Sequence, residues 1–245
     1  MKLDLRTLVL IISILVSVGC TSVNYTTPAG GVSISSLTDD DIAELLRVEP
    51  EGQFPARIAV ARIQSSGYYS RTTNSFGSGR YSIVTVRDIE DEADFETLSS
   101  MPMVADVVAL NRLLVPPELD SIKDLRLAAA RLKTDLLLIY SIDTGFHVES
   151  TPLGPLSIIA LGNLPNKQAH VSSTTSGALI DVRTGFIYGA SESTMREEKR
   201  TNTWNTRESI DEARLKAEKT SFKSFVNGFE ELWGSVIARY ATTES

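Results

Sequence analysis

The sequence predicts an α/β (α+β) fold in which a mixed β-sheet of about five strands is packed by helices. Two observations predict it. A helix-like stretch at 121–132 runs through a short turn into the apolar stretch LLLIYSI at 136–142, as in the second half of a βαβ unit. A long stretch at 209–240 repeats apolar residues three and four positions apart, which indicates an amphipathic helix packed across a sheet.

The elements nearest the N-terminus of the domain are a short helix and two strands. Thr38 is a candidate N-cap for a helix with the sequence IAELL, which should end before Pro55. Residues 56–64 (ARIAVARIQ) and 81–87 (YSIVTVR) predict strands, because they are rich in β-branched residues and contain no Gly or Pro. The Ser/Gly/aromatic loop between them, at 65–80, is long enough to be functional or mobile.

Three further stretches lead to the apolar strand at 136–142. The acidic run DIEDEADFE at 88–96 predicts a solvated helix start, and it lacks the glycine turn of a calcium loop. Residues 101–119 fit either a short helix or a strand, and two prolines end the apolar run in both cases. Ser121 is a candidate N-cap for the next helix. The apolar stripe of that helix consists of Leu125, Ala128, Ala129 and Leu132.

The last elements are a β-hairpin and the long C-terminal helix. Residues 168–182 and 186–198 predict paired strands, because the short turn at 183–185 places a glycine late in the loop. Ser209 and Glu212 fit a capping box, so we expect the helix to begin there and to run to about Tyr240. Its apolar stripe is Phe222, Phe225, Val226, Phe229, Leu232, Trp233, Val236, Ile237 and Tyr240. A coiled-coil seam is the alternative, but the aromatic residues favour packing on a sheet.

The N-terminus predicts a bacterial lipoprotein signal peptide at residues 1–19. A basic start is followed by an apolar run at 8–18, which is too short to span a bilayer as a helix of about 20 residues. Gly19 precedes Cys20, the only cysteine in the chain, and this pair resembles the lipobox of bacterial lipoproteins. The resemblance implies cleavage between Gly19 and Cys20, with an S-diacylglycerol and an N-acyl group on Cys20. The alternatives are a secreted protein with one free thiol, or a short N-terminal anchor.

The lipoprotein resemblance also implies a location and a domain organisation. Thr21 follows the cysteine, and by the sorting rule of enteric lipoproteins this implies the outer membrane, with the protein facing the periplasm. We expect residues 20–35 to form a lipidated flexible tether and residues 36–245 to form a single α/β domain. Removing residues 1–19 makes the net charge one unit more negative than −7, which argues against a nucleic-acid partner.

Two stretches carry a wider family resemblance. DLRLAAARLKTDLLLIYSID at 124–143 resembles the helix-then-strand element of CsgG-like and TolB-N-like envelope lipoproteins. SGALIDVRTGFIYGASES at 176–193 resembles the hairpin that follows in the same group, with its turn at Asp181, Thr184 and Gly185. The whole layout is similar to the rhombotarget lipoproteins, a family named for its genomic association with a rhomboid-type sorting protease. The last residues, ARYATTES, lack the glycine-rich sorting motif, so we expect no processing there.

The sequence contains no recognisable catalytic or metal-binding motif, and we expect neither a catalytic residue, a metal nor a cofactor. The two histidines, His147 and His170, each stand alone among polar or strand residues, whereas a tetrahedral zinc site needs three or four ligands. The Ser/Thr run at 172–176 is more simply the solvated face of a strand than a source of nucleophiles. An enzyme acting on cell-wall or lipid material is the alternative, through a site that sequence order hides.

An apolar insertion at about 144–167 is the candidate contact site. Its central segment, TPLGPLSIIALGNLP, is punctuated by Pro and Gly. The contact residues would be Leu153, Leu156, Ile158, Ile159 and Leu161. The alternative is that this loop folds back and covers the sheet. We therefore expect a lipid-anchored, non-enzymatic binding or assembly protein of the cell envelope, with an envelope protein partner or self-association. The first alternative to this function is a subunit of an oligomeric envelope or secretion complex, and the second is the enzyme described above.

Overall fold

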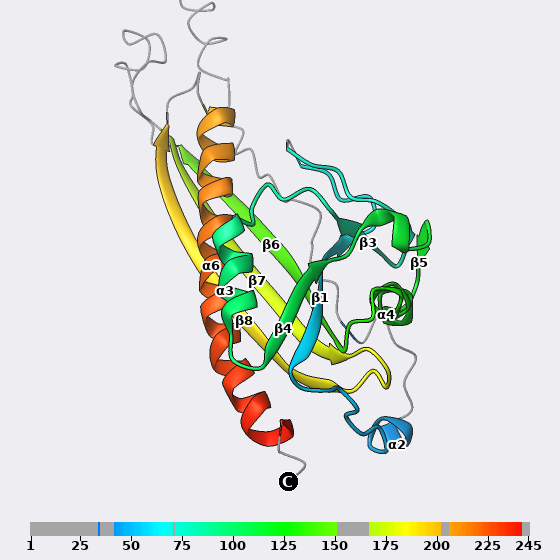
Figure 1. Cartoon of the computed structure of the whole chain (residues 1–245). Coiled ribbons are helices and arrows are strands. Elements are labelled where there is room, and N and C mark those ends of the chain that lie inside the picture. Colours follow the sequence, from blue (N-terminus) through cyan, green and yellow to red (C-terminus); the bar gives the residue numbers. More distant parts are fainter. Residues whose placement is uncertain (1–33, 35–41, 71, 151–166, 202–205, 242–245) are drawn as a thin grey trace, which may run out of the picture.

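A mixed six-stranded sheet forms the centre of the molecule (Figure 1). The computed structural model describes residue 34 and residues 42–70, 72–150, 167–201 and 206–241. The strand order is β3–β1–β6–β7–β8, and β4 also pairs with β1. The strands are β1 (Ala56–Ser65), β3 (Tyr81–Val84), β4 (Val104–Ala109), β6 (Leu136–Ser150), β7 (Lys167–Asp181) and β8 (Ile187–Thr201). The predicted fold class is confirmed, with six strands where about five were expected.

Strand β1 shares one of its edges between two neighbours. Its first half, at 56–60, pairs in parallel with β4, and its second half, at 62–65, pairs antiparallel with β3. Its other edge runs parallel to β6. Strand β4 shows that the ambiguous stretch at 101–119 begins as a strand. The 3-10 helix η2 (Arg112–Leu114) follows it, and then β5 (Glu118–Leu119), which pairs with β2 (Ser78–Gly79) in a separate two-stranded sheet.

Helices cover both faces of the sheet. Helices α3 (Glu92–Ser100) and α6 (Thr206–Tyr240) lie in front of the sheet in Figure 1, and α4 (Ile122–Arg131) contributes to the core on the opposite face. The short helix α2 (Ile42–Leu45) lies at the lower end of the molecule in the same view. Helix α4 begins as predicted. Ser121 precedes it, and the Asp124 carboxylate accepts the Ser121 backbone N–H at 3.0 Å.

Alternate residues of the strands divide the core into two clusters. Ala59, Ile63, Ile139 and Ala178 face α4, and the cluster on that side also holds Leu125 and Ala128 of this helix. Ile58, Val60, Leu138 and Tyr140 face the other way, toward α6. That helix buries the stripe predicted from the sequence: Phe222, Phe225, Val226, Phe229, Trp233 and Val236 are buried, and Leu232, Ile237 and Tyr240 are partly buried. The indole of Trp233 donates to the Pro102 carbonyl at 2.7 Å, which ties α6 to the start of β4.

The β7–β8 hairpin closes around the buried carboxylate of Asp181. One carboxylate oxygen accepts the backbone N–H groups of Arg183 and Thr184 at 2.8 and 3.0 Å, which closes the turn. The other accepts the Glu51 backbone N–H at 2.7 Å and the Tyr188 hydroxyl at 3.0 Å. Gly185 has φ +83°, a conformation that favours glycine, so the Asp-x-x-Thr-Gly pattern is explained by the geometry of the turn.

Several predicted boundaries are wrong. Strand β6 continues to Ser150, so residues 144–150 belong to a strand and not to the apolar insertion. The long pairing with β7 supplies backbone hydrogen bonds that local sequence does not reveal. Strand β3 ends at Val84, three residues before the predicted end. Helix α6 includes residues from Thr206 onward, so Ser209 lies within its first turn and is not its N-cap. Thr38 lies outside the described residues.

Candidate functional site

Strands β6, β7 and β8 form a long extension of the sheet with two different faces. Each strand has 15 residues, and β7 pairs along its length with both neighbours. Helix α6 runs beside all three strands in Figure 1 and covers one face. On the other face, Glu192, Thr194, Arg196 and Glu198 of β8 are exposed. We call this second surface the open face.

The open face is built from polar side chains in cross-strand rows. The members of the four rows are Ser141, Ser176 and Glu192; Asp143, Thr174 and Thr194; Gly145, Ser172 and Arg196; and His147, His170 and Glu198. In two of the rows, neighbouring side chains are hydrogen-bonded. Ser176 donates to the Glu192 carboxylate at 2.8 Å, and the Thr174 and Thr194 hydroxyls lie 2.8 Å apart. The face therefore offers hydroxyls and charges of both signs, and it differs from the apolar patches that mark hydrophobic contact sites.

A hollow of about 250 Å³ lies at the inner end of the open face. Ile63 and Ile139 contribute apolar lining, while Ser141, Ser176 and Glu192 contribute polar groups. Ile34 also lines this hollow, and it packs against the core cluster on the α4 side of the sheet. Ile34 belongs to the predicted tether at 20–35, and this residue therefore lies at the open face.

A second hollow of about 340 Å³ lies at the outer end, where the two histidines meet. His147 and His170 are directly opposite each other on β6 and β7, with ring centroids 6.4 Å apart. His170 Nδ1 also lies 3.3 Å from a carboxylate oxygen of Glu198 on β8. The prediction that each histidine stands alone is therefore wrong, because the hairpin joins positions 23 residues apart. Within the described ranges, no group of three or more His, Cys, Asp and Glu side chains is arranged to hold a metal ion.

Behind the open face, a buried polar network lies between the sheet and the helices. The Arg62 guanidinium on β1 is 3.1 Å from Asp88 and 3.5 Å from Glu90, and the Tyr140 hydroxyl donates to Glu90 at 2.6 Å. Burial lowers the pKa of Arg62, but the charges around it, with Glu90 the largest contributor, outweigh this effect and leave the pKa raised. Burial and the charge of Glu90 raise the pKa of Tyr140 well above its ordinary value, so the phenol stays protonated.

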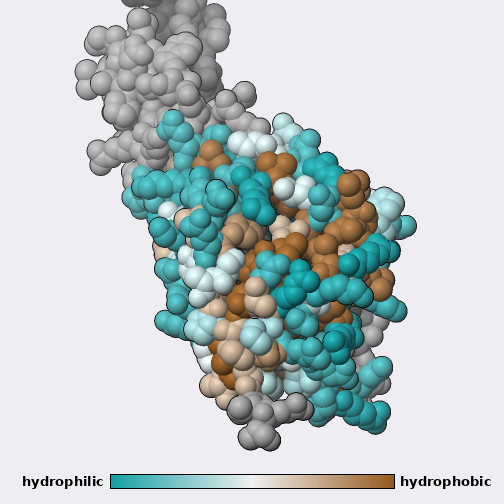
Figure 2. Space-filling model, in the orientation of Figure 1, coloured by the Kyte–Doolittle hydropathy of each residue, from teal (hydrophilic) through white to brown (hydrophobic). Residues whose placement is uncertain are grey.

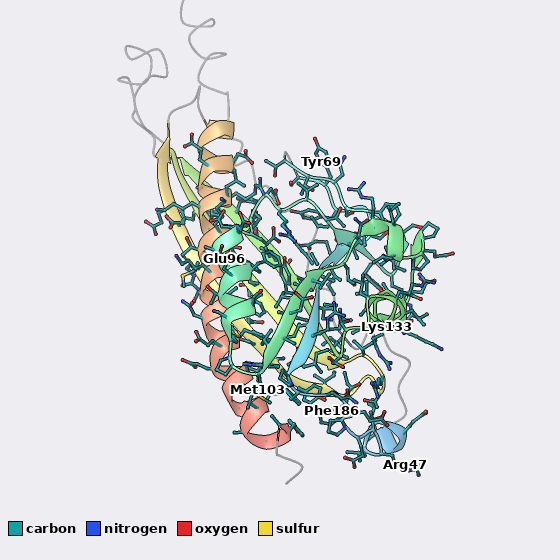
Figure 3. The ribbon with its side chains drawn as sticks, in the orientation of Figure 1. Arg47, Tyr69, Glu96, Met103, Lys133 and Phe186 are labelled. Carbon is teal, nitrogen blue, oxygen red and sulfur yellow. The ribbon has the colours of Figure 1, made fainter. Side chains whose placement is uncertain are left out.

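The prediction that the acidic run at 88–96 is solvated is consequently wrong for two of its members. Glu90 is 6% exposed because it pairs with Arg62 and Tyr140. Asp94 is 9% exposed and accepts the Asp91 backbone N–H at 2.9 Å, which caps α3. Glu96, in contrast, is exposed on α3, as expected for a solvated helix (Figure 3). The sequence spacing of the run does not reveal which carboxylate is buried, because Arg62, which pairs with Glu90, lies in a distant part of the sequence.

A second part of the network joins α6 to the strands. Arg214 of α6 is 2.8 Å from the Glu218 carboxylate, which also accepts the Thr144 hydroxyl at 2.8 Å. Burial raises the pKa of Glu218 above its ordinary value, and Arg214 opposes this shift. On β7, the Ser173 and Thr175 hydroxyls lie 3.2 and 2.8 Å from that of Ser221 on α6.

The prediction that the Ser/Thr run at 172–176 is a solvated face is therefore correct for alternate residues only. Ser173 and Thr175 are fully buried against α6, whereas Ser172, Thr174 and Ser176 belong to the open face. The alternation of a strand sends neighbouring hydroxyls to opposite sides of the sheet. The buried hydroxyls bond to a helical serine, so they fix the position of α6 and are not presented to a substrate.

The residues predicted from sequence as sites fall outside the described part of the chain. These are Gly19 and Cys20, and the loop residues Leu153, Leu156, Ile158, Ile159 and Leu161. Because Ser150 pairs with Lys167, the loop is attached at the outer end of the β6–β7 hairpin. The sequence did not predict the open face, because residues 172–176 are polar at every position and residues 192–198 are polar at every position except Met195, so no alternation marks the exposed side.

Exposed apolar side chains are scattered over the described residues. On the face shown in Figure 2, they form a broken band between polar regions. The large ones include Val86, Met103, Leu113 and Leu127.

In the ranges that the structure describes, no helix has the length and apolar character needed to cross a membrane. Comparison with known proteins found no matching family model and no matching curated protein.

Proposed function

We propose that this protein is a lipid-anchored binding protein of the cell envelope, held through Cys20 on the periplasmic side of the outer membrane. Its open face would take the partner, and its role would be binding or assembly without catalysis. The observation that carries the proposal is the position of Ile34 beside the open face, 14 residues after Cys20. A chain of that length reaches at most about 50 Å, so the anchor would keep this end of the open face within about 50 Å of the membrane surface.

The physical advantage of this arrangement is confinement. Each lipid methylene that enters the membrane contributes about 0.8 kcal/mol, so an anchor of several chains holds firmly without a spanning helix. A tethered domain meets partners on the same surface at a much higher effective concentration than a free one. The hydroxyls and mixed charges of the open face suit a hydrogen-bonding protein or peptide partner.

Metabolic labelling tests the anchor. Cells that express the protein are grown with a labelled fatty acid, and wild type is compared with Cys20→Ala. We expect label on the wild-type protein and none on the variant. Label on Cys20→Ala, or its absence from wild type, refutes the anchor.

Site-specific photocrosslinking tests the open face. A photoreactive residue at Thr174, on the central strand of the open face, should capture an envelope protein in intact cells. Glu96 serves as the matched control, because it is exposed on α3, on the opposite side of the sheet. Equal capture from the two positions, or none from Thr174, would contradict the proposed surface.

A further inference from the structure

The outer strand of the sheet has an edge with which no other described strand pairs. In the part of the chain that the structure describes, β8 ends the strand order and pairs with β7 alone. It is 15 residues long, about three times a common strand, so its outer edge presents a long row of backbone donors and acceptors. Such an edge is a template for another strand, and proteins normally shorten, cover or charge it.

The charges on β8 favour one register for antiparallel pairing with the β8 strand of a second copy. On the open face this strand carries Glu192, Thr194, Arg196 and Glu198, all exposed. If two copies pair antiparallel about a two-fold axis at Thr194, each Glu192 lies opposite Arg196 of the other copy. The same register places Ile187 opposite Thr201, so the strand pairs along its whole length. Opposite charges in cross-strand pairs are stabilising by about 0.2–1 kcal/mol each.

The neighbouring registers are worse. An axis at Met195 puts Glu192 opposite Glu198, and an axis at Arg196 puts two arginines opposite each other. An axis at Ser193 leaves Glu192 and Arg196 opposite uncharged residues. A register shifted by one residue would place the open faces of the two copies on opposite sides of the joined sheet. The register centred on Thr194 is therefore the one that combines full length with charge complementarity.

We propose that two copies of this chain associate through β8, antiparallel and centred on Thr194, to form one continuous sheet. Such a two-fold contact is closed, which limits assembly to a dimer. Both open faces would lie on the same side, and the two α6 helices on the other, because α6 packs on β8 and β7 of its own copy. The dimer would present two open faces and, under the proposed function, two anchors.

A single-cysteine experiment tests this register. In the full chain carrying Cys20→Ser, kept in mild detergent, Thr194→Cys supplies the only thiol. Because the axis passes through this position, mild oxidation should convert most of the chain into a disulfide-linked dimer on a non-reducing gel. Leu127→Cys, at a position 51% exposed on α4, is the control and should remain monomeric. If the two variants give the same amount of dimer, the pairing is wrong.

Charge reversal gives an independent readout by sedimentation equilibrium. Glu192→Arg and Arg196→Glu should each weaken the dimer by about tenfold or more, because each places like charges opposite one another twice. The double variant restores opposite charges and should recover most of the affinity. Singles that associate like wild type, or a double variant no better than the singles, would overturn the proposal. Circular dichroism checks that each variant is folded, and photocrosslinking from Thr174 reports on the open face separately.

Discussion

Replacing Glu90 with alanine should destabilise the domain by about 3 kcal/mol. The side chains of Arg62 and Glu90 are each 2% exposed, and the Tyr140 residue is 3% exposed, so water does not replace the lost carboxylate. Removing one member of a buried ion pair costs about 3–5 kcal/mol, and a buried hydroxyl that loses its acceptor costs about 1–3 kcal/mol. The two effects overlap, and Arg62 still has Asp88 at 3.1 Å as a partner. The total loss of unfolding free energy should therefore lie near about 3 kcal/mol, the lower end of the range for a buried ion pair.

Urea denaturation of the full chain carrying Cys20→Ser measures this loss. With a slope of about 2.5 kcal/mol per molar urea, the midpoint should fall by about 1.2 M. Tyr140→Phe removes only the hydroxyl and should cost about half as much. The matched control is Glu96→Ala, which removes an exposed carboxylate a short distance along the chain and should change the unfolding free energy by less than about 0.5 kcal/mol. Equal effects of Glu90→Ala and Glu96→Ala would refute the buried network.

Three further changes test the packing, the turn and the charge on α6. Gly177→Ala should lower the unfolding free energy by about 1–3 kcal/mol and so lower the melting temperature, because the new Cβ would lie 2.5 Å from a ring atom of Phe225. Gly145→Ala is the control: its Cβ would meet open space, so the melting temperature should stay nearly unchanged. Asp181→Asn keeps one oxygen to accept the turn N–H groups, but it replaces the second oxygen with an NH₂ group. That NH₂ cannot accept from the Glu51 backbone N–H and the Tyr188 hydroxyl, so the unfolding free energy measured by urea denaturation should fall by about 2 kcal/mol. The raised pKa of Glu218 means that the folded state holds the proton more tightly than the unfolded state. The unfolding free energy of wild type relative to Glu218→Gln should therefore decrease as the pH rises above 4.5, the ordinary pKa of a glutamate, and a difference that does not change with pH would contradict the raised pKa.

The predictable part of the fold rests on local periodicity and local turn chemistry. The stripe that repeats from Phe222 to Val236 has the period of a helix, so its buried face follows from the sequence alone. Ser121 and Asp124 cap α4 through contacts three residues apart, and Asp181 closes its turn in the same local way. Each of these contacts joins residues only a few positions apart, so a short stretch of sequence is enough to predict it.

The boundaries and the site depend on contacts between distant segments. Strand β6 continues past residue 142 because β7 pairs with it, although Asp143 and Gly145 have low strand propensity. Glu90 is buried because Arg62 and Tyr140 meet it from two strands. The two histidines of the open face meet only when the hairpin forms.

The sequence by itself determined the class of fold and the long helix on the sheet, since each depends on a pattern within a short window. The lipid attachment at Cys20 is a prediction from the same kind of pattern. Only the tertiary structure decided which polar residues are buried and which form the open face. Successive residues of a strand point to opposite sides, and whether a side is covered depends on a helix that comes later in the chain. Ser173 and Thr174 illustrate this: the first is buried under α6, and the second lies on the open face one position further along.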